Sequence, residues 1–456
     1  MTALWTSAEL RAATGGALAA EVVVTGISID TRSIAAGDLF VALRDVRDGH
    51  DFVADALAKG AAAALVDRDP PGVAPDAPLL RVGDTLAGLT ELGAAARRRS
   101  GARFVGVTGS VGKTTTKEML RTALSASGRT HAADASYNNQ WGVPLTLART
   151  PRDAAFAVIE IGMNHPGEIA PLARLARPHV AVITAVETAH IGHMGSLEAI
   201  AREKATIAAG LEPGGTAVLP AESPLLPILR EAAAGARIVT FGEGGDAHAL
   251  RVAADAEGSD IEATILGHRI AFRLGTPGLH MARNAVAALA AAAALGADLE
   301  AGAARLAGFR AMPGRGDRRT IATPDGGSAL LLDEAYNGQP PSMRAALALL
   351  KLLPGRRKLA VLGQMGELGG FAEAEHIALA SHLREAADLV FACGPLMRHA
   401  VAALPPAMVG AWTASVTDLA PIVRDAVRDG DTILVKGSLA TGMKAVVRAL
   451  TESPAA

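Results

Sequence analysis

A glycine-rich turn between a strand-like run and a helix-like run constrains the fold of this chain more than any other feature. The apolar run FVGV at 104–107 is typical of a buried strand, and KTTTKEMLRTAL at 113–124 is typical of a helix. Between them, Gly109 and Gly112 let backbone N–H groups turn inward around phosphate oxygens, beside the positive end of the helix. The sequence therefore predicts an α/β unit that carries a phosphate-binding loop.

The side chains of this loop fit a nucleoside triphosphate with a divalent cation. Lys113 would neutralise the terminal phosphates, and the Thr114 hydroxyl would be a ligand of Mg²⁺. The usual pattern has glycine at 107, where this chain has Val107, so the loop is a variant. The alternative interpretation is a glycine-rich turn with an exposed lysine. A strand before the turn and a helix after it favour the phosphate loop over this alternative. We predict that ATP binds at Thr108, Gly109, Ser110, Val111, Gly112, Lys113, Thr114 and Thr115.

Short β-rich runs alternate with Ala- and Leu-rich helical runs along the chain, which is typical of α/β domains with mostly parallel sheets. At 456 residues the chain is too long for one ordinary core. Breaks are expected near residues 84 and 312, the second inside the turn-rich AMPGRGD at 311–317. We expect three domains, at 1–84, 85–312 and 313–456. Within the second, the alternating region 237–275 is typical of an appended antiparallel sheet.

Composition excludes several classes of partner. The net charge is −2 with scattered Lys and Arg, so no basic face for nucleic acid is expected. The one cysteine, Cys393, cannot form an internal disulfide, which suits a reducing compartment. The N-terminus does not resemble a signal peptide, and the longest apolar run, 285–295, is better explained as a buried helix than as a membrane span. A cytoplasmic protein, and a monomer, is the expectation.

Ionisable residues follow several predicted strands, where ligands of parallel sheets bind. Glu160 ends AAFAVIE and could hold Mg²⁺, although a solvated glutamate at a turn would look the same. His190 and His193 follow VAVITAV, and a single histidine is more often structural than a ligand. Lys204 lies on an amphipathic helix, where a solvated lysine is the ordinary interpretation. These residues, taken alone, leave their roles open.

The last domain repeats this pattern at four strand ends. Asp333 follows ALLL, Gly363 follows LAVL, Gly394 follows LVFAC, and Lys436 follows TILV. Because the carboxyl ends of parallel strands meet at one edge, we predict a second ligand-binding rim that faces the ATP loop.

Eight motifs then occur in one order: TGSVGKTTTKE, YNNQWGVPLTL, EIGMNHPGEI, AHIGHMGS, MPGRGDRR, DEAYNGQPPSM, LGQMGELG and KGSLATGM. Together they resemble the Mur ligases and, through the pattern YNxxPxSM, the members of that family that add D-alanyl-D-alanine. The resemblance runs from ISIDTRS at 27–33 to KGS at 436–438. It implies a uridine-nucleotide domain, a central ATPase domain and a Rossmann-like domain. It also implies that D-Ala-D-Ala is joined to UDP-MurNAc-tripeptide through an acyl-phosphate, the last cytoplasmic step of the peptidoglycan precursor.

The resemblance assigns substrate contacts residue by residue. Asn138 and Asn139 match the surface that holds the sugar-peptide, and Asn284 matches the adenine contact. The uridine-nucleotide contacts are matched by Ser28, Asp30, Thr31 and Arg32. The residues that close over the nucleotide from the C-terminal side are matched by Arg315, Asp333 and Asn337.

The resemblance also assigns the metal ligands. Thr114 and Glu160 match the site of one Mg²⁺, and His190 rather than His193 matches a ligand of a second. Lys204 matches a lysine that is carbamylated in this family, and a carbamate offers the anionic oxygens that Mg²⁺ prefers. Catalysis is thus expected to depend on Lys113, Glu160, His190 and Lys204. A hinge at 311–317 would close the third domain over the site.

Two positions depart from the family pattern, and rival functions stay open. Leu439 follows KGS where many relatives have arginine, and Gln364 stands where they have aspartate, so the pairing of the dipeptide carboxylate is in doubt. A P-loop kinase or simple ATPase would explain the loop but not the N-terminal domain. Another Mur-type ligase, or a ligase similar to folylpolyglutamate synthase, would use the same chemistry. A non-catalytic nucleotide-binding regulator would retain the fold without the activity.

Overall fold

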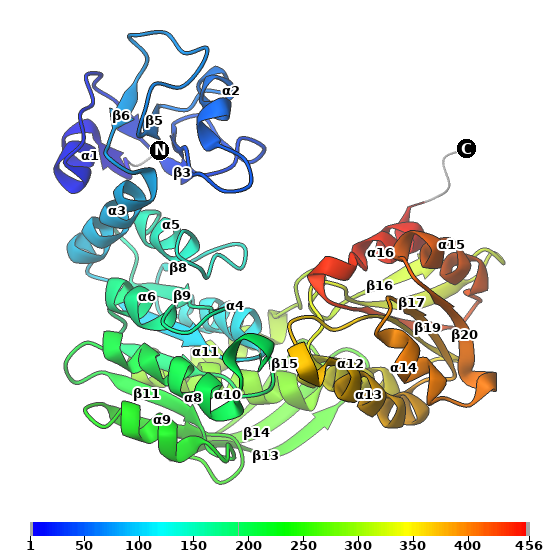
Figure 1. Cartoon of the computed structure of the whole chain (residues 1–456). Helices are drawn as coiled ribbons and strands as arrows, with labels where there is room; N and C mark the ends of the chain where they lie inside the picture. Colours follow the sequence, from blue (N-terminus) through cyan, green and yellow to red (C-terminus); the bar gives the residue numbers. More distant parts are fainter. Residues whose placement is uncertain (1–2, 190, 453–456) are drawn as a thin grey trace.

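The computed structural model describes residues 3–189 and 191–452, in which three separate α/β regions follow one another along the chain (Figure 1). The first contains a parallel sheet of β3 (Gly26–Ser28), β4 (Asp38–Val41), β5 (Ala63–Val66) and β6 (Leu79–Arg81), in that order. Helix α1 (Ser7–Thr14) begins at a capping box between Thr6 and Glu9. Helix α2 (Val53–Ala58) and a two-stranded ribbon of β1 (Trp5–Thr6) and β2 (Val23–Val24) complete this region.

Helix α3 (Thr85–Arg99) joins the first region to the second, and Asp84 caps its N-terminus. It packs against α5 (Gly142–Ala148), where a Cβ on Gly93 would lie 2.9 Å from the carbonyl oxygen of Pro144. Such a close approach of two helices requires glycine at that position.

The central region is built on one sheet in the order β15-β14-β13-β12-β11-β10-β7-β9-β8. Its parallel strands are β7 (Arg103–Thr108), β8 (Thr130–Ala132), β9 (Phe156–Glu160), β10 (Val180–Ile183), β11 (Thr216–Pro220) and β12 (Arg237–Phe241). Its remaining strands are β13 (Ala247–Ala254), β14 (Ser259–Ile265) and β15 (His268–Leu274). Strand β14 pairs antiparallel with both β13 and β15.

The prediction of a separate antiparallel sheet over 237–275 is therefore wrong in part. Strand β12 lies parallel to β11, because helix α9 (Leu226–Ala232) carries the chain back across the sheet between them. Strands β13 to β15 then extend this same sheet as an antiparallel meander.

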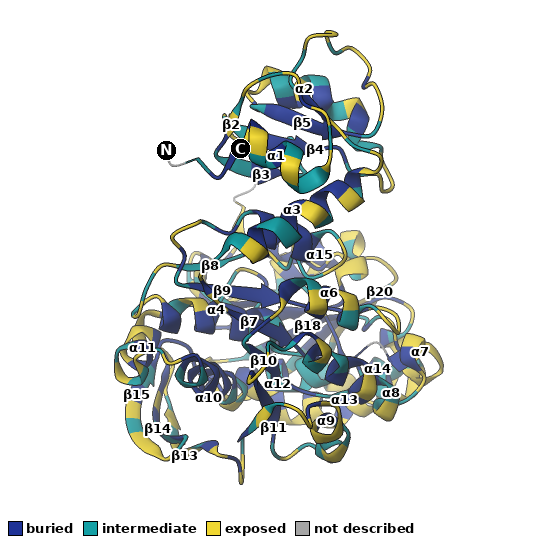
Figure 2. Ribbon diagram, turned by 90° about the vertical axis from the view of Figure 1, so that its left-hand side faces the viewer, coloured by how far each residue is buried: buried dark blue, intermediate teal, exposed yellow. Residues whose placement is uncertain are grey.

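Helices cover both faces of the parallel strands (Figure 2). One face packs on α4 (Lys113–Leu124) and α10 (Leu279–Ala294), and the other packs on α5, α6 (Ile169–Ala176), α8 (Leu197–Ala205) and α9. Helix α10 is almost completely buried against the sheet, because its small alanine side chains allow close packing. The buried helix predicted at 285–295 begins earlier, at Leu279, because Gly278 supplies a backbone φ of +117° directly before it. The short helix α7 (Ile191–Met194) adds two buried residues to one of these faces, and α11 (Leu299–Arg305) packs on α4 and α10 at the other.

The third region contains a six-stranded sheet in the order β16-β17-β21-β18-β19-β20. The four predicted strands are present as β17 (Ser328–Glu334), β18 (Lys358–Gly363), β19 (Leu389–Cys393) and β21 (Thr432–Lys436), all parallel. Edge strands β16 (Asp317–Ala322) and β20 (Val409–Thr413) were not predicted, because each is polar or half-exposed along its length. The helices of this region are α12 (Pro340–Leu352), α13 (Ala372–Ala386), α14 (Met397–Ala402), α15 (Val416–Ala426) and α16 (Lys444–Thr451).

The second and third regions meet at the carboxyl ends of their sheets. The Gly192 N–H donates to the Glu367 carbonyl at 3.0 Å, and a Cβ on Gly192 would lie 2.6 Å from the Gly369 nitrogen. On the other side, the Arg318 guanidinium donates to the carbonyls of Ala256 and Glu257 in the β13–β14 turn. No helix among the described residues is both long and apolar enough to cross a membrane.

Candidate active site

The phosphate-binding loop lies between β7 and α4, as predicted, and neighbouring strands fix its shape. Gly109 has φ +150° and Gly112 has φ +81°, conformations that favour glycine. The Thr184 hydroxyl, at the end of β10, donates to the Val111 carbonyl at 2.6 Å. The Ser110 hydroxyl donates to the Glu187 carbonyl at 2.9 Å. The loop is thus held open before any ligand binds, which lowers the entropy cost of binding phosphate.

We expect Gly109→Ala to lower ATP-dependent turnover by about a hundredfold, since small displacements at a reacting centre have effects of that size. The new Cβ would lie 1.9 Å from the Thr184 hydroxyl and would push the loop off that strand. Steady-state phosphate release measures the effect. Gly101→Ala is the matched control, since open space surrounds that position just before β7, and equal activity of the two variants would contradict the argument.

Lys113 is the first residue of α4. Its ammonium lies over the loop and donates to the Gly109 carbonyl at 2.7 Å. Burial lowers the pKa of Lys113, while the carboxylates of Glu160 and Glu367 act in the opposite direction. A lysine at the start of a helix, beside a glycine-rich turn, is the arrangement that binds a triphosphate.

Oxygen atoms gather beside Lys113 in a set that suits Mg²⁺. The Thr114 hydroxyl lies 3.0 Å from the Ser136 hydroxyl and donates to Glu160 Oε1 at 3.1 Å. Asn138 Nδ2 donates to the same carboxylate oxygen at 2.8 Å. Glu160 Oε2 is buried and has no hydrogen-bond partner among the described residues. A buried carboxylate oxygen of this kind needs a cation or donor, so these residues fit the metal predicted from the sequence.

The described residues contain no group of three His, Cys, Asp or Glu side chains placed to hold a metal. Mg²⁺ is usually held by one or two carboxylates together with substrate phosphates and water, and the Glu160 carboxylate beside the Thr114 hydroxyl offers ligands of this kind.

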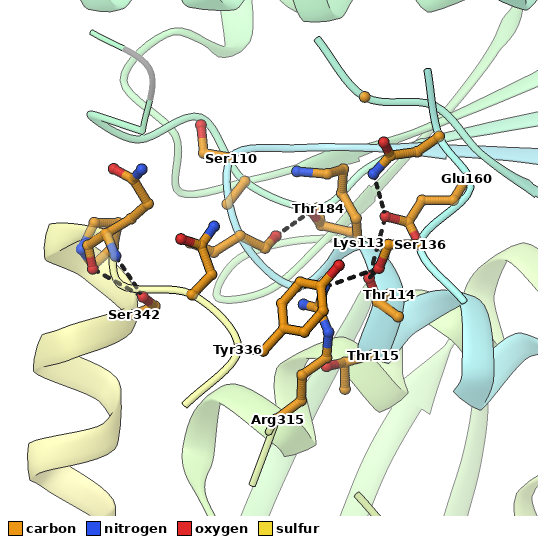
Figure 3. A pocket seen from close by; sticks show the side chains of 18 of the residues that line it. Ser110, Lys113, Thr114, Thr115, Ser136, Glu160, Thr184, Arg315, Tyr336 and Ser342 are labelled. Carbon is orange, nitrogen blue, oxygen red and sulfur yellow. Dashed lines mark hydrogen bonds between the residues drawn. The ribbon is translucent and has the colours of Figure 1, made fainter. Parts of the chain in front are cut away.

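A cleft of about 580 Å³ opens over the loop and is lined by both the second and the third regions (Figure 3). Arg315, just before β16, donates to the Ser136 hydroxyl at 2.9 Å and stacks 4.0 Å above the Tyr336 ring. From the third sheet, Lys436 donates to Glu334 at 3.1 Å and to the Asn337 carbonyl at 2.8 Å. Of the strand ends predicted to form a rim, Lys436 lines this cleft and faces the ATP loop, whereas Gly363 and Gly394 are not among the residues that line it.

Most of the predicted nucleotide and sugar-peptide residues line this cleft. They are Ser110, Val111, Gly112, Lys113, Thr114, Thr115, Asn138, Asn139, Glu160, Asn284, Arg315 and Asn337. Thr108 and Gly109 form the turn behind the lining. Asp333 is 5% exposed and sits beneath the rim, where it pairs with Arg319 at 3.1 Å and accepts from the Ala335 N–H.

The residues predicted to contact uridine lie in the first region, away from the cleft lining. The buried Ser28 hydroxyl accepts from the Asp30 N–H at 3.2 Å. Two guanidinium nitrogens of Arg32 donate hydrogen bonds to the Asp30 carboxylate, and this pairing lowers the pKa of Asp30. Thr31 lies between them, and its carbonyl accepts from Lys59.

Lys204 is 1% exposed near the end of α8. Burial, followed by repulsion from Lys113, holds the pKa of Lys204 well below its ordinary value. Its neighbour Glu203 accepts from the N–H groups of Gly167 and Ile169. The prediction for His190 lies outside the described residues, whereas His193 is exposed with its ring 5.1 Å from that of His165.

Sequence reasoning missed several residues of the cleft. Tyr336 and Gln339 stand inside the DEAYNGQPPSM motif but were not singled out, and Glu334 directly follows a residue that was. Ser136 directly precedes the YNNQW motif. Only its hydrogen bonds to Thr114 and Arg315 identify it as a residue of the site. His280 carries no local signal, because it reaches the cleft only through the placement of α10.

The phosphate loop lies on a parallel sheet, and charged residues of a second sheet face it across the cleft. This arrangement defines a nucleotide-dependent α/β enzyme of the P-loop type. Three family descriptions match the chain: "Mur ligase family, catalytic domain" at 23–97, "Mur ligase middle domain" at 107–292 and "Mur ligase, glutamate ligase domain" at 318–439. The chain belongs to the Mur ligase family.

Individual relatives are similar over almost the whole chain. A protein of Synechocystis sp. named UDP-N-acetylmuramoyl-tripeptide–D-alanyl-D-alanine ligase is 37% identical over 96% of this chain and 94% of its own length. The Escherichia coli protein of that name is 37% identical, with 95% of each chain covered. A crystal structure of MurF from Acinetobacter baumannii has a TM-score of 0.85 at 32% identity and covers 98% of this chain and 99% of its own. MurF of Thermotoga maritima in complex with ADP has a TM-score of 0.78 at 27% identity, over 94% and 97%.

Proposed function

We propose that this chain is the ligase that joins D-alanyl-D-alanine to UDP-MurNAc-tripeptide at the expense of ATP. The observation that carries the proposal is full-length similarity to ligases named for this reaction, combined with a phosphate loop that faces a second charged rim. The same similarity sets aside a simple kinase, since all three regions of the chain match one family of ligases.

The chemistry follows from the poor reactivity of a carboxylate toward amines. An oxygen of the tripeptide carboxylate attacks the γ-phosphorus of ATP, the bond to the β,γ-bridging oxygen breaks, and ADP leaves. The amine then attacks the carbonyl carbon of the mixed anhydride, a C–N bond forms, phosphate leaves with the C–O electron pair, and the nitrogen loses a proton to solvent. Lys113 and Arg315 reduce the repulsion between the two anions of the first step, and the third region excludes water from the anhydride.

The metal ligands are part of the proposal. Thr114 and Glu160 would hold one Mg²⁺, and His190 with Lys204 as a carbamate would hold a second. Mg²⁺ would neutralise phosphate charge during the transfer. Burial favours the uncharged amine of Lys204, which is the form whose nitrogen lone pair adds to CO₂ with loss of a proton.

Substrate contacts and location are proposed on the sequence pattern. Ser28, Asp30, Thr31 and Arg32 would contact the uridine nucleotide, and Asn138 and Asn139 would hold the sugar-peptide. Asn284 would contact adenine, while Arg315, Asp333 and Asn337 would act from the C-terminal side. Domain boundaries near 84 and 312, a cytoplasmic location and a monomeric state remain predictions.

Phosphate release from ATP tests the proposal. The ligase should release phosphate only with both UDP-MurNAc-tripeptide and D-Ala-D-Ala present, and mass spectrometry should identify the UDP-MurNAc-pentapeptide. A kinase would instead leave phosphate on one substrate, and a non-catalytic regulator would bind ATP without turnover. Parallel reactions with tripeptides that end in diaminopimelate or lysine identify the accepted acid.

A further inference from the structure

Gln339 directly precedes helix α12 and lines the cleft, yet its side chain is 4% exposed. Its backbone is fixed by Ser342, whose hydroxyl accepts from the Gln339 N–H at 3.1 Å and donates to the Gln339 carbonyl at 2.9 Å (Figure 3). The position of this side chain in the cleft is therefore set by the start of the helix.

The orientation of the Gln339 amide is set by a carboxylate. Gln339 Nε2 donates to Glu367 Oε2 at 3.4 Å. Because a carboxylate only accepts, the NH₂ group must face Glu367 and Oε1 must face away from it. Glu367 is itself fixed, with φ +61° and a carbonyl that accepts from Gly192 of the central region.

Gln339 Oε1 is buried and has no hydrogen-bond partner among the residues that the structure describes. A buried acceptor left in this state costs about 1–3 kcal/mol, so a donor is expected to reach it during function. The acid and the phosphates carry acceptors in the reaction, whereas the attacking amine carries N–H donors.

The Gln339–Glu367 pair lies at the phosphoryl end of the cleft. The Glu367 carboxylate interacts with the ammonium of Lys113, which lies over the phosphate loop. At the phosphoryl end the reacting groups are the γ-phosphate, the acid and the amine, and of these the amine is the donor.

We propose that Gln339 binds the amine of the incoming dipeptide, with Oε1 accepting one N–H and thereby directing the nitrogen lone pair to the acyl carbon. Glu367 positions the amide for this contact. The inference rests on the ligase function proposed above. Since Oε1 is enclosed, the amine has to enter before the third region closes on the loop.

Gln339→Met removes the acceptor and keeps the side-chain length. We expect the KM for D-Ala-D-Ala to rise about tenfold or more, which corresponds to about 1.4 kcal/mol, while the KM for ATP stays unchanged. The thermal midpoint of the ligand-free variant should change little, because removal of an unpaired buried acceptor offsets the lost hydrogen bond from Nε2 to Glu367. Gln339→Asn, which retains an amide one methylene shorter, should recover part of the dipeptide affinity.

A structural role for Gln339 would instead lower the thermal midpoint and change the KM of both substrates together. An unchanged KM for D-Ala-D-Ala in Gln339→Met, or an equal rise for ATP, would overturn the inference while leaving the ligase function intact. Failure of the parent chain to turn over with D-Ala-D-Ala would count against the ligase function itself, so the two failures are distinguishable.

Discussion

Lys113→Ala should lower ATP-dependent phosphate release by about a thousandfold with both peptide substrates present, because removing one positioned charge from a phosphoryl-transfer site has effects of this order. The ammonium of Lys113 is already held over the loop by the Gly109 carbonyl, and the Glu160 carboxylate lies close enough to favour its charged form. Its loss leaves the γ-phosphate and the attacking carboxylate to repel each other without this compensation.

The Lys113 prediction is measured by steady-state phosphate release and by the thermal midpoint of the same samples. Lys351→Ala is the matched control, since Lys351 pairs with Glu385 on the exposed surface and both side chains are more than half exposed. It should leave turnover unchanged. A Lys113→Ala enzyme that keeps more than about a tenth of its turnover would mean that the phosphates bind elsewhere in the chain.

The loop could be predicted from sequence because every part of it is local. A buried strand, two glycines in turn conformations and a helix that begins with lysine follow one another within 103–124. Lys436 was predictable for a similar reason, because it ends a parallel strand of the third region and so lies at the edge that faces the loop, whereas its partner Glu334 was not singled out.

The remaining parts of the site depend on tertiary contacts that leave no local pattern. Ser136 matters because it touches both Thr114 and Arg315, which come from two different regions. The parallel pairing of β12 depends on the crossover through α9, and alternation alone resembles an antiparallel meander. Motifs of the family placed Asn337 in the cleft, but its contact with Lys436 is visible only in the structure.

Lys204→Met should also lower turnover by about a thousandfold, because it removes the proposed carbamate ligand of the second Mg²⁺. Methionine keeps the volume of the side chain, so the packing of α8, in which Lys204 is 1% exposed, should be retained. Carbon-13 NMR in labelled bicarbonate gives a second readout, in which the parent chain should show a carbamate resonance that the variant lacks.

Lys117 is the internal control for that resonance, since it is also fully buried but donates to the carbonyls of Ala133 and Ala135 and lies 3.0 Å from Glu118. Three oxygen atoms already accept from or pair with the Lys117 Nζ, whereas burial and then the nearby charge of Lys113 lower the pKa of Lys204 and leave an amine that can add to CO₂. Lys117→Met should therefore keep the resonance. A fully active Lys204→Met enzyme, or a resonance that survives in it, would remove the carbamate from the mechanism and leave the first metal site, at Thr114 and Glu160, to act alone.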